Sequence, residues 1–287
     1  MRVRSFAVLP PSGPETEAAL ASLKGRSASV IVWGPYHDHR QVVVTRGSYE
    51  AMRVEALDSL AHAAVDTRGV LADIARTGHP NDIGDRRPVV VALAAANPMM
   101  AALGPIVDAG IRVRSVGPPA VALNSLARLR RGLDAPGIDA YVAVEENATC
   151  IALVRDGALI AARELQWGYH VDRCGSHDTR QREDIAARLG DELADFFAAS
   201  GASTGAVGQV CVCGGVPELR SMTLPLMERL DVEVEPLDSL FGIDEARVPE
   251  PASQFRDRAA ELRLAWAAAA DWPPPLNLWR ARRHDCA

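Results

Sequence analysis

Two short polar stretches that follow apolar runs contain residue types that could bind a phosphate or a metal ion. The first is Glu-Glu-Asn-Ala-Thr at 145–149, and the second is the Gly-Gly pair at 214–215. A Gly-Gly pair between a strand and a helix lets a ligand approach the backbone and reach free N–H groups. A carboxylate can hold Mg²⁺ through water, and a threonine hydroxyl can donate to a phosphate. A tight turn without a ligand explains the Gly-Gly pair equally well.

Histidine and cysteine also occur in three places where a metal site could be considered. His37 and His39 flank Asp38, and two histidines and a cysteine lie at 170–177. Neither group has four ligands at the spacing of a zinc site, so we interpret both as solvated loops. Cys211 and Cys213 share one face of a predicted strand and suit a core better than a metal. We therefore expect no metal centre.

The composition excludes several classes of protein. The 287 residues carry a net charge of −6, which provides no basic surface for nucleic acid. The N-terminus lacks the apolar segment of a signal peptide, and no unbroken apolar run is long enough to span a membrane. Five scattered cysteines fit a reducing cytosol better than a disulfide framework. We expect a cytoplasmic protein without a membrane span of its own.

The second half of the chain is organised around an antiparallel meander. Strands are predicted at 140–145, 150–155 and 158–166, and Asp156-Gly157 between the last two is typical of a type I′ hairpin turn. Runs that are apolar on both faces indicate a sheet covered on both sides. Five further elements follow: a helix at 183–200, a strand at 207–213, a helix to about 230, a strand at 232–234 and a helix at 254–270. This order predicts a mixed sheet with helices on its faces.

The first half shows weaker patterns. We predict a strand at 3–9, a helix at 15–24, strands at 29–33 and 41–45 around a polar loop, and a helix at 48–65 capped by Ser48. A buried strand at 88–95 precedes a helix capped by Asn97 that ends at Gly110. A strand at 111–116, a helix at 119–131 and a linker at 132–137 complete this half.

Three local motifs resemble a known family. Arg163 to Gly168 is similar to an Arg-x-Ile-x-x-Gly strand end, and Cys213-Gly214-Gly215 stands where that family has Ser-Gly-Gly. The family is the PilM-like type IV pilus assembly proteins of the actin-like ATPase superfamily, with the cytoplasmic part of GspL-type secretion proteins as a relative. Leu276-Asn277-Leu278 resembles the Ile-Asn-Leu peptide of the pilus partner PilN, which GspL has before its membrane span.

This resemblance implies a fold and a division of the chain. The fold class is α/β: a two-lobed actin-like (RNase H-like) fold with mixed sheets, whose first lobe is incomplete and carries a small strand-helix-strand-strand insert. The first lobe would span 1–137 with the insert at about 28–87, and the second 138–270. A Pro-rich extended tail would occupy 271–287.

The resemblance also allows the polar stretches to be compared with a nucleotide site. Actin-like ATPases hold phosphates between two hairpins with Asp-x-Gly turns, and the sequence before Pro10 has no such turn. In the second hairpin, Asn147 stands where glycine would let the backbone close on a phosphate. We predict a degenerate site lined by Glu145, Asn147 and Thr149 opposite Gly214 and Gly215. We expect no catalytic residue and no tightly bound ATP. Mg-ATP would bind at most weakly.

Three functions are compatible with the resemblance. The first is a non-hydrolysing scaffold of a type IV pilus or type II secretion-like machine at the inner face of the inner membrane. Its expected partner is a PilN-like single-span membrane protein or its N-terminal peptide, and an assembly motor ATPase is a further candidate. The second is an ATP-binding PilM-like protein whose partner affinity is switched by nucleotide. The third, a sugar or acid kinase, would need a catalytic aspartate in a recognisable context.

The tail carries the predicted partner contact. Pro273-Pro274-Pro275 favours an extended path that places Leu276 and Leu278 on one face and Asn277 on the other. Such a segment can insert two apolar side chains into pockets while its asparagine hydrogen-bonds to backbone. We expect it to occupy, in this chain or a neighbour, the groove that a PilN-like peptide would use. A frayed terminus is the alternative.

Overall fold

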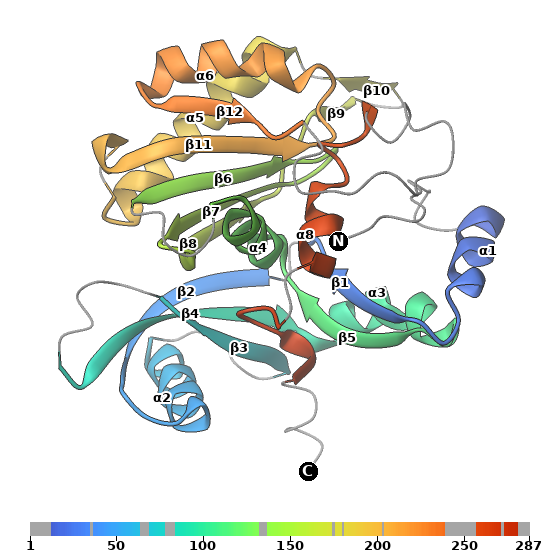
Figure 1. Cartoon of the computed structure of the whole chain (residues 1–287), viewed down its shortest axis with the longest axis vertical. Helices are drawn as coiled ribbons and strands as arrows, with labels where there is room; N and C mark the ends of the chain where they lie inside the picture. The colour runs from blue at the N-terminus through green and yellow to red at the C-terminus, as the bar shows by residue number, and fades with distance from the viewer. Residues whose placement is uncertain are drawn as a thin grey trace.

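The largest sheet among the described residues is a five-stranded mixed sheet in the upper half of Figure 1. The structure, a computed structural model, describes residues 13–34, 37–63, 69–77, 84–131, 137–173, 176–179, 181–202, 204–238, 257–270 and 273–280. β6 (Ile138–Val144), β7 (Thr149–Arg155) and β8 (Ala158–Leu165) form the predicted antiparallel meander. The turn between β7 and β8 has positive φ at Asp156 (51°) and Gly157 (75°), as a type I′ turn requires. The meander is therefore confirmed.

The remaining two strands of this sheet are parallel to β6. β11 (Val207–Gly214) pairs with β6 on one side and with β12 (Glu233–Pro236) on the other, giving the order β12-β11-β6-β7-β8. This confirms that strand 207–213 belongs to the sheet of the meander. Because parallel strands end at the same sheet edge, the residues after Val144 and after Gly214 come together.

Helices cover both faces of the five-stranded sheet. α5 (Arg182–Ala199) and α6 (Thr223–Leu230), with the 3₁₀ turns η1 (Thr204–Ala206) and η2 (Leu219–Met222), lie on one face. α4 (Pro119–Arg131) and α8 (Arg263–Ala270) lie on the other (Figure 1). α5 turns an apolar stripe of helical period toward the sheet: Ile185, Leu189, Leu193, Phe196 and Phe197. Because core residues cover both faces of the sheet, polar and apolar residues do not alternate regularly along its strands.

Two smaller sheets form the first lobe. β1 (Ser27–Ile31) pairs in parallel with β5 (Arg112–Gly117), near α1 (Pro14–Ser22) and α3 (Ala96–Asp108). β2 (His37–Thr45), β3 (Val70–Arg76) and β4 (Arg86–Ala95) form an antiparallel sheet in the order β2-β4-β3. α2 (Tyr49–His62) packs on it, and the Ser48 hydroxyl accepts the N–H of Ala51 as the predicted cap. The order of β2, α2, β3 and β4 confirms a strand-helix-strand-strand insert.

Several local predictions differ from the structure. β2 begins at His37, so 37–39 is strand rather than loop, and β1 and β2 pair with β5 and β4 instead of with each other. β1 lies within the predicted insert span of about 28–87, yet it belongs to the β1-β5 sheet. α3 starts at Ala96 with Ala95 at the N-cap, so Asn97 is not the cap. The two strand errors share a cause, because long-range strand pairing overrides local turn signals.

Other predicted elements have different bounds in the structure or lie outside the described residues. The polar loop after the meander contains a hairpin of β9 (His170–Arg173) and β10 (Ser176–Thr179). The helix predicted at 217–230 is divided into η2 and α6, and the last helix begins at Arg263 rather than at 254. The strand at 3–9 and most of the linker at 132–137 lie outside the described residues.

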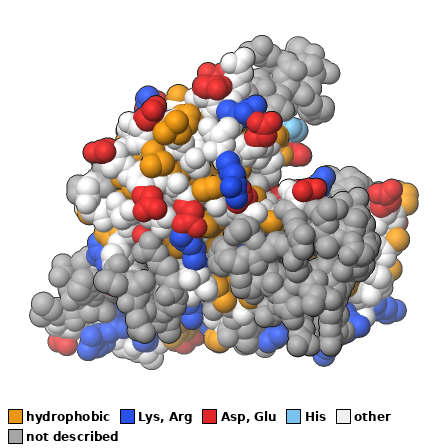
Figure 2. All heavy atoms as spheres, turned by 45° about the horizontal axis from the view of Figure 1, so that its top comes forward, with side chains coloured by type: hydrophobic (Ala, Val, Ile, Leu, Met, Phe, Trp, Pro, Cys, Tyr) orange, Lys and Arg blue, Asp and Glu red, His pale blue; other side chains and the backbone are white. Residues whose placement is uncertain are grey.

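The surface around α5 and α6 mixes both signs of charge. Figure 2 shows Asp and Glu beside Arg on this face, with hydrophobic side chains among them. Arg229 of α6 forms an ion pair with Asp191 of α5, and the exposed apolar side chains of α6 are Leu224 and Met227. The described helices include none that is long and apolar enough to cross a membrane.

Candidate functional site

The ends of β6, β8 and β11 converge on one closely packed turn. The loop at 145–148 closes with a hydrogen bond from the Glu145 N–H to the Ala148 carbonyl (2.9 Å). The chain after β8 returns to this loop, where Tyr169 N–H donates to the Glu145 carbonyl (3.1 Å). A Cβ on Gly168 would lie 1.9 Å from that carbonyl oxygen, so only glycine fits here. The Gly that ends the Arg163–Gly168 motif therefore has a steric role.

The Gly-Gly pair after β11 faces the same turn. Gly214 has φ of 114°, and a Cβ there would lie 2.2 Å from the Val144 carbonyl oxygen. Gly215 N–H donates to this carbonyl at 3.1 Å, while a Cβ on Gly215 would meet the Tyr169 hydroxyl at 3.0 Å. Gly214 is thus required by backbone packing within the chain itself, which is the tight-turn alternative considered from the sequence.

The predicted nucleotide-site residues are only partly brought together. The Glu145 carboxylate lies beside Gly215, where it would be 3.3 Å from a Cβ at that position. Asn147 is exposed at the loop. Thr149 is fully buried, and its hydroxyl donates to the Trp167 carbonyl at 2.8 Å. The structure therefore joins Glu145 with Gly214 and Gly215 but directs the Thr149 hydroxyl into the protein.

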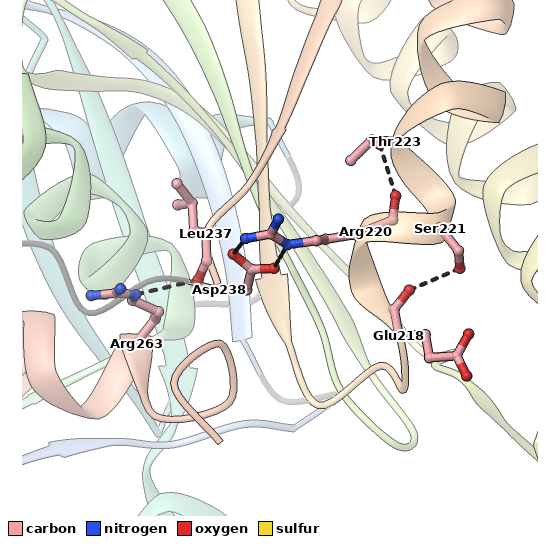
Figure 3. A network of polar contacts seen from close by, with 7 residues as sticks. All are labelled: Glu218, Arg220, Ser221, Thr223, Leu237, Asp238 and Arg263. Carbon is pink, nitrogen blue, oxygen red and sulfur yellow. Dashed lines mark hydrogen bonds and ion pairs between the residues drawn. The ribbon is translucent and has the colours of Figure 1, made fainter. Parts of the chain in front are cut away.

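A cavity of about 570 Å³ opens next to Gly214 and Gly215. Among the residues that the structure describes, its ionisable lining comprises four carboxylates and two arginines: Glu218, Asp238, Asp257, Glu261, Arg220 and Arg258. Figure 3 shows Arg220 reaching across to Asp238, with hydrogen bonds of 2.5 and 3.1 Å. Arg258 is paired with Glu261 at 3.0 Å. Each of these two arginines is therefore paired with a carboxylate of the same cavity.

Neighbouring contacts hold this wall in place. The Ser221 hydroxyl donates to the Glu218 carbonyl and the Thr223 hydroxyl to the Arg220 carbonyl, both at 2.8 Å (Figure 3). The Arg263 Nε–H donates to the Leu237 carbonyl at 3.3 Å. Sequence reasoning missed Asp238, Arg258 and Glu261, because they stand in no motif and reach the cavity from separate segments.

Burial and like charge alter proton affinity at this turn. Burial raises the pKa of Glu145 to about 7, with the charges of Glu261 and Glu146 adding to the effect and the Gly215 N–H opposing it. Burial also raises the pKa of Tyr169 to about 12, helped by the same three carboxylates. The site therefore favours the uncharged form of the one carboxyl group that faces the glycines.

We expect this carboxyl to make the protein less stable as pH rises. The folded-state pKa of Glu145, about 7, exceeds its ordinary value of 4.5, so the folded protein holds the proton that the unfolded chain releases. Unfolding free energy should fall between about pH 4.5 and pH 7 and then level off. In urea unfolding across this range, Glu145→Gln should flatten the slope, whereas Glu17→Gln on α1 should not. An unchanged slope in Glu145→Gln would contradict this origin.

Of the cysteine and histidine groups, the pair on β11 lies in the core as predicted. Cys211 and Cys213 are buried on the α4 and α8 side of the sheet, and burial raises the pKa of Cys211 to about 12 and that of Cys213 further. The described residues contain no group of three His, Cys, Asp or Glu that could hold a metal ion. Cys174 and the side chains of 171–180 lie outside the described residues, so that group stays an interpretation.

A second site is formed in the first lobe by the tail. Leu276, Asn277 and Leu278 are 1%, 2% and 0% exposed. Both leucines join a core cluster with residues of β3, β4, α3 and β5: Leu71, Ala75, Ala92, Ala94, Met99, Leu103 and Val116. The segment therefore lies in an apolar groove of its own chain rather than at a frayed end. That a PilN-like peptide would use this groove stays a prediction.

Asn277 is bound on both sides. Its Oδ1 accepts the Val116 N–H at 3.0 Å, and its Nδ2–H donates to the Arg114 carbonyl at 3.2 Å. Its own backbone N–H donates to the Asp73 carboxylate, which also accepts the Tyr49 hydroxyl. The tail therefore fills the seam between β5 and β3, which belong to different sheets. The extended path ends at Asn277, because a helical turn starts at residue 278.

Comparison with solved structures places the fold. The chain is similar to a structure described as the PilM-PilN type IV pilus biogenesis complex, with a TM-score of 0.68 and 20% identity over 88% of this chain and 84% of that one. A weaker match is the cytoplasmic domain of EpsL, an inner membrane component of the Vibrio cholerae type II secretion system, with a TM-score of 0.47, 13% identity and coverage of 90% and 82%. No family model and no curated protein matches the sequence.

The sheet order and the similarity to the PilM-PilN structure agree with the predicted two-lobed actin-like fold. The five-stranded sheet with helices on both faces, the second set of sheets and the strand-helix-strand-strand insert are those expected of this class. Within it, the overall structure is similar to that of PilM.

Proposed function

We propose that this chain is a non-hydrolysing scaffold of a type IV pilus or type II secretion-like envelope machine, with a PilN-like single-span membrane protein as its partner. The observation that carries the non-hydrolysing part is the charge of the cavity beside Gly214 and Gly215, where carboxylates outnumber arginines among the described lining residues and pair with both of these arginines. The similarity to PilM in a complex with PilN supports the choice of machine and partner.

The cavity is a poor environment for a polyphosphate. Triphosphate oxygens are strongly anionic and require cations or N–H donors that are free to turn toward them. Arg220 and Arg258 already pair with Asp238 and Glu261, and Glu145 adds a further acid group at the glycines. Bringing a phosphate close would either break these ion pairs or add like charge at short range. The residues before Pro10, where the resemblance would place a first-lobe hairpin and the sequence has no Asp-x-Gly turn, lie outside the described residues.

The predicted donors of the second lobe support the same conclusion. Thr149 is buried with its hydroxyl on the Trp167 carbonyl, so donating to a phosphate would break a buried hydrogen bond. The Gly215 N–H is already used by the Val144 carbonyl. The residues present therefore fit Mg-ATP poorly, and an assembly motor ATPase would have to supply any hydrolysis from outside this chain.

Calorimetric titration of Mg-ATP into the full chain tests this proposal. We expect no saturable heat at concentrations up to about 1 mM, which corresponds to binding weaker than about 4 kcal/mol. Mg-ATP is used because bound Mg²⁺ offsets part of the phosphate charge. Phosphate release, measured in parallel, should equal the rate without protein.

A matched variant makes the result decisive. Gly215→Val adds a side chain against the Tyr169 hydroxyl and the Glu145 carboxylate, where a phosphate would approach. Tight binding to the natural chain that is lost in this variant would overturn the scaffold and favour the nucleotide-switched adaptor. Gly205→Val serves as the matched control, because a Cβ at Gly205 would meet open space and Gly205 lies outside the cavity lining.

A further inference from the structure

We infer that the cavity beside Gly214 and Gly215 binds an organic cation, a guanidinium or ammonium group, at the end where the Tyr169 hydroxyl meets the glycine wall. The inference goes beyond the proposed function, which uses the charge of this cavity only against a polyphosphate, and it does not depend on the machine that the chain serves. Two sources carry the required chemistry, a free polyamine and the basic side chain of a polypeptide. A hydroxyl without a partner, a group of carboxylates and the spacing of those carboxylates support the inference.

The first observation is a buried hydroxyl without a hydrogen bond. Tyr169 is 8% exposed, and its hydroxyl forms no hydrogen bond with any described residue. The hydroxyl oxygen lies 3.0 Å from the position that a Cβ on Gly215 would take, so it faces the glycine wall of the cavity. Buried polar atoms usually have a hydrogen-bond partner, either in the protein or in a bound molecule. An N–H donor placed in the cavity would supply this partner, because a phenolic oxygen accepts hydrogen bonds.

The second observation is the charge that surrounds this hydroxyl. Three carboxylates act on Tyr169 through their charge: Glu145, Glu146 and Glu261. The first two belong to the turn after β6 and form no ion pair with a described residue, whereas Glu261 pairs with Arg258 at 3.0 Å. Like charges held together in a partly buried turn repel one another. A cation placed among them would remove that repulsion, so this end of the cavity favours a positively charged ligand.

The third observation distinguishes an organic cation from a metal ion. Among the described residues, no three His, Cys, Asp or Glu are grouped closely enough to hold a metal ion. The carboxylates therefore do not surround one point, as the ligands of Mg²⁺ or Ca²⁺ must. A guanidinium or ammonium group presents several N–H donors and can bridge separate carboxylates and a hydroxyl. The cavity of about 570 Å³ has room for such a group, and Arg220 is already paired with Asp238 (Figure 3).

Binding should tighten as pH rises, because a bound cation favours the ionised form of Glu145. Burial raises the pKa of this carboxyl to about 7, so it holds its proton at about pH 6 and has largely released it at about pH 8. The affinity should increase by up to about tenfold per pH unit below the pKa and level off above it. The titratable and charged groups around this carboxyl come from its own turn, the chain after β8, β11 and the segment before α8: Glu146, Tyr169, His170, Cys213, Arg258 and Glu261. Tyr169 and Cys213 stay protonated in this range, because burial raises the pKa of each.

The test follows the backbone amide signals of Gly214 and Gly215 in NMR spectra of the isotope-labelled full-length chain. The probe is N-acetyl-arginine amide, and N-acetyl-citrulline amide is its matched control, since it has the same shape without the positive charge. We expect saturable shifts with the arginine compound that weaken as salt is added, and no comparable shifts with the citrulline compound. Spermidine and a blocked tripeptide with a central arginine then distinguish the two sources by their relative affinities.

Three variants assign the binding to this end of the cavity. Tyr169→Phe removes no hydrogen bond to a described residue, so it should keep the urea-unfolding midpoint and yet weaken binding by about two- to tenfold. Glu261→Gln should weaken binding at least about fivefold, because it removes a charge and leaves Arg258 without its carboxylate. Glu145→Gln should abolish the pH dependence, whereas Glu17→Gln on α1 should bind like the natural chain.

Each outcome supports or overturns the inference. Equal shifts with the arginine and citrulline compounds would overturn it, as would undiminished binding by both Tyr169→Phe and Glu261→Gln. Displacement of the arginine compound by MgCl₂ at constant ionic strength would overturn it in favour of a metal site. No nucleotide is present in these measurements, so a chain that binds neither Mg-ATP nor the arginine compound would contradict this inference and leave the scaffold proposal intact.

Discussion

Gly168→Ala is expected to destabilise the protein by at least about 3 kcal/mol, because the added methyl group has no space. Its Cβ would lie 1.9 Å from the Glu145 carbonyl oxygen and 2.4 Å from that of Glu146. Both neighbours are backbone atoms of a closed loop, so they cannot move away as a flexible side chain would. Relief requires breaking the hydrogen bonds from Tyr169 and His170 to these two carbonyls.

A second glycine provides the matched control for this substitution. A Cβ on Gly190 in α5 would lie 2.4 Å from Cδ of Arg229, the flexible end of a half-exposed side chain. Gly190→Ala should therefore cost little, since helix propensity favours alanine by about 1 kcal/mol. Urea-unfolding midpoints of the two variants measure the difference. Equal midpoints would show that the turn at Gly168 is looser than the structure indicates.

Phe197→Ala is expected to cost about 3–5 kcal/mol, the range for removing a buried aromatic side chain. Phe197 is fully buried between α5 and the five-stranded sheet, in the core cluster that contains Leu193 and Val212. Truncation leaves a cavity that rigid strands on one side and a helix on the other cannot close. The loss should appear in the urea-unfolding midpoint of the second lobe.

Leu224→Ala is the control on the neighbouring helix. Leu224 of α6 is 61% exposed, so its truncation should alter unfolding free energy by no more than about 0.5 kcal/mol. A small effect of Phe197→Ala, close to that of Leu224→Ala, would mean that the face covered by α5 is not a packed core. If two unfolding transitions appear, the effect of each substitution is read from the transition of the second lobe, because lobes of one chain can unfold separately.

The second half of the fold was predictable because its signals are local. Asp156 and Gly157 specify a turn by their own backbone preferences, and the stripe from Ile185 to Phe197 specifies a helix by its period. Strands that are apolar on both faces indicate a covered sheet. The first half was harder, because β2 and β4 pair over a long sequence separation, and the local pattern around His37 resembles a loop.

The sequence alone therefore determined the meander, the helices that cover it, the presence of a Gly-Gly turn after a strand and a docking motif in the tail. Only the tertiary structure decided that Asp238 and Glu261 neutralise the arginines of the cavity, that Gly168 is required by the Glu145 carbonyl, and that Asn277 binds β5 of its own chain. Propensity and periodicity depend on neighbouring residues. Ion pairs, close backbone approaches and groove contacts depend on residues that only the folded chain brings within a few ångströms of one another.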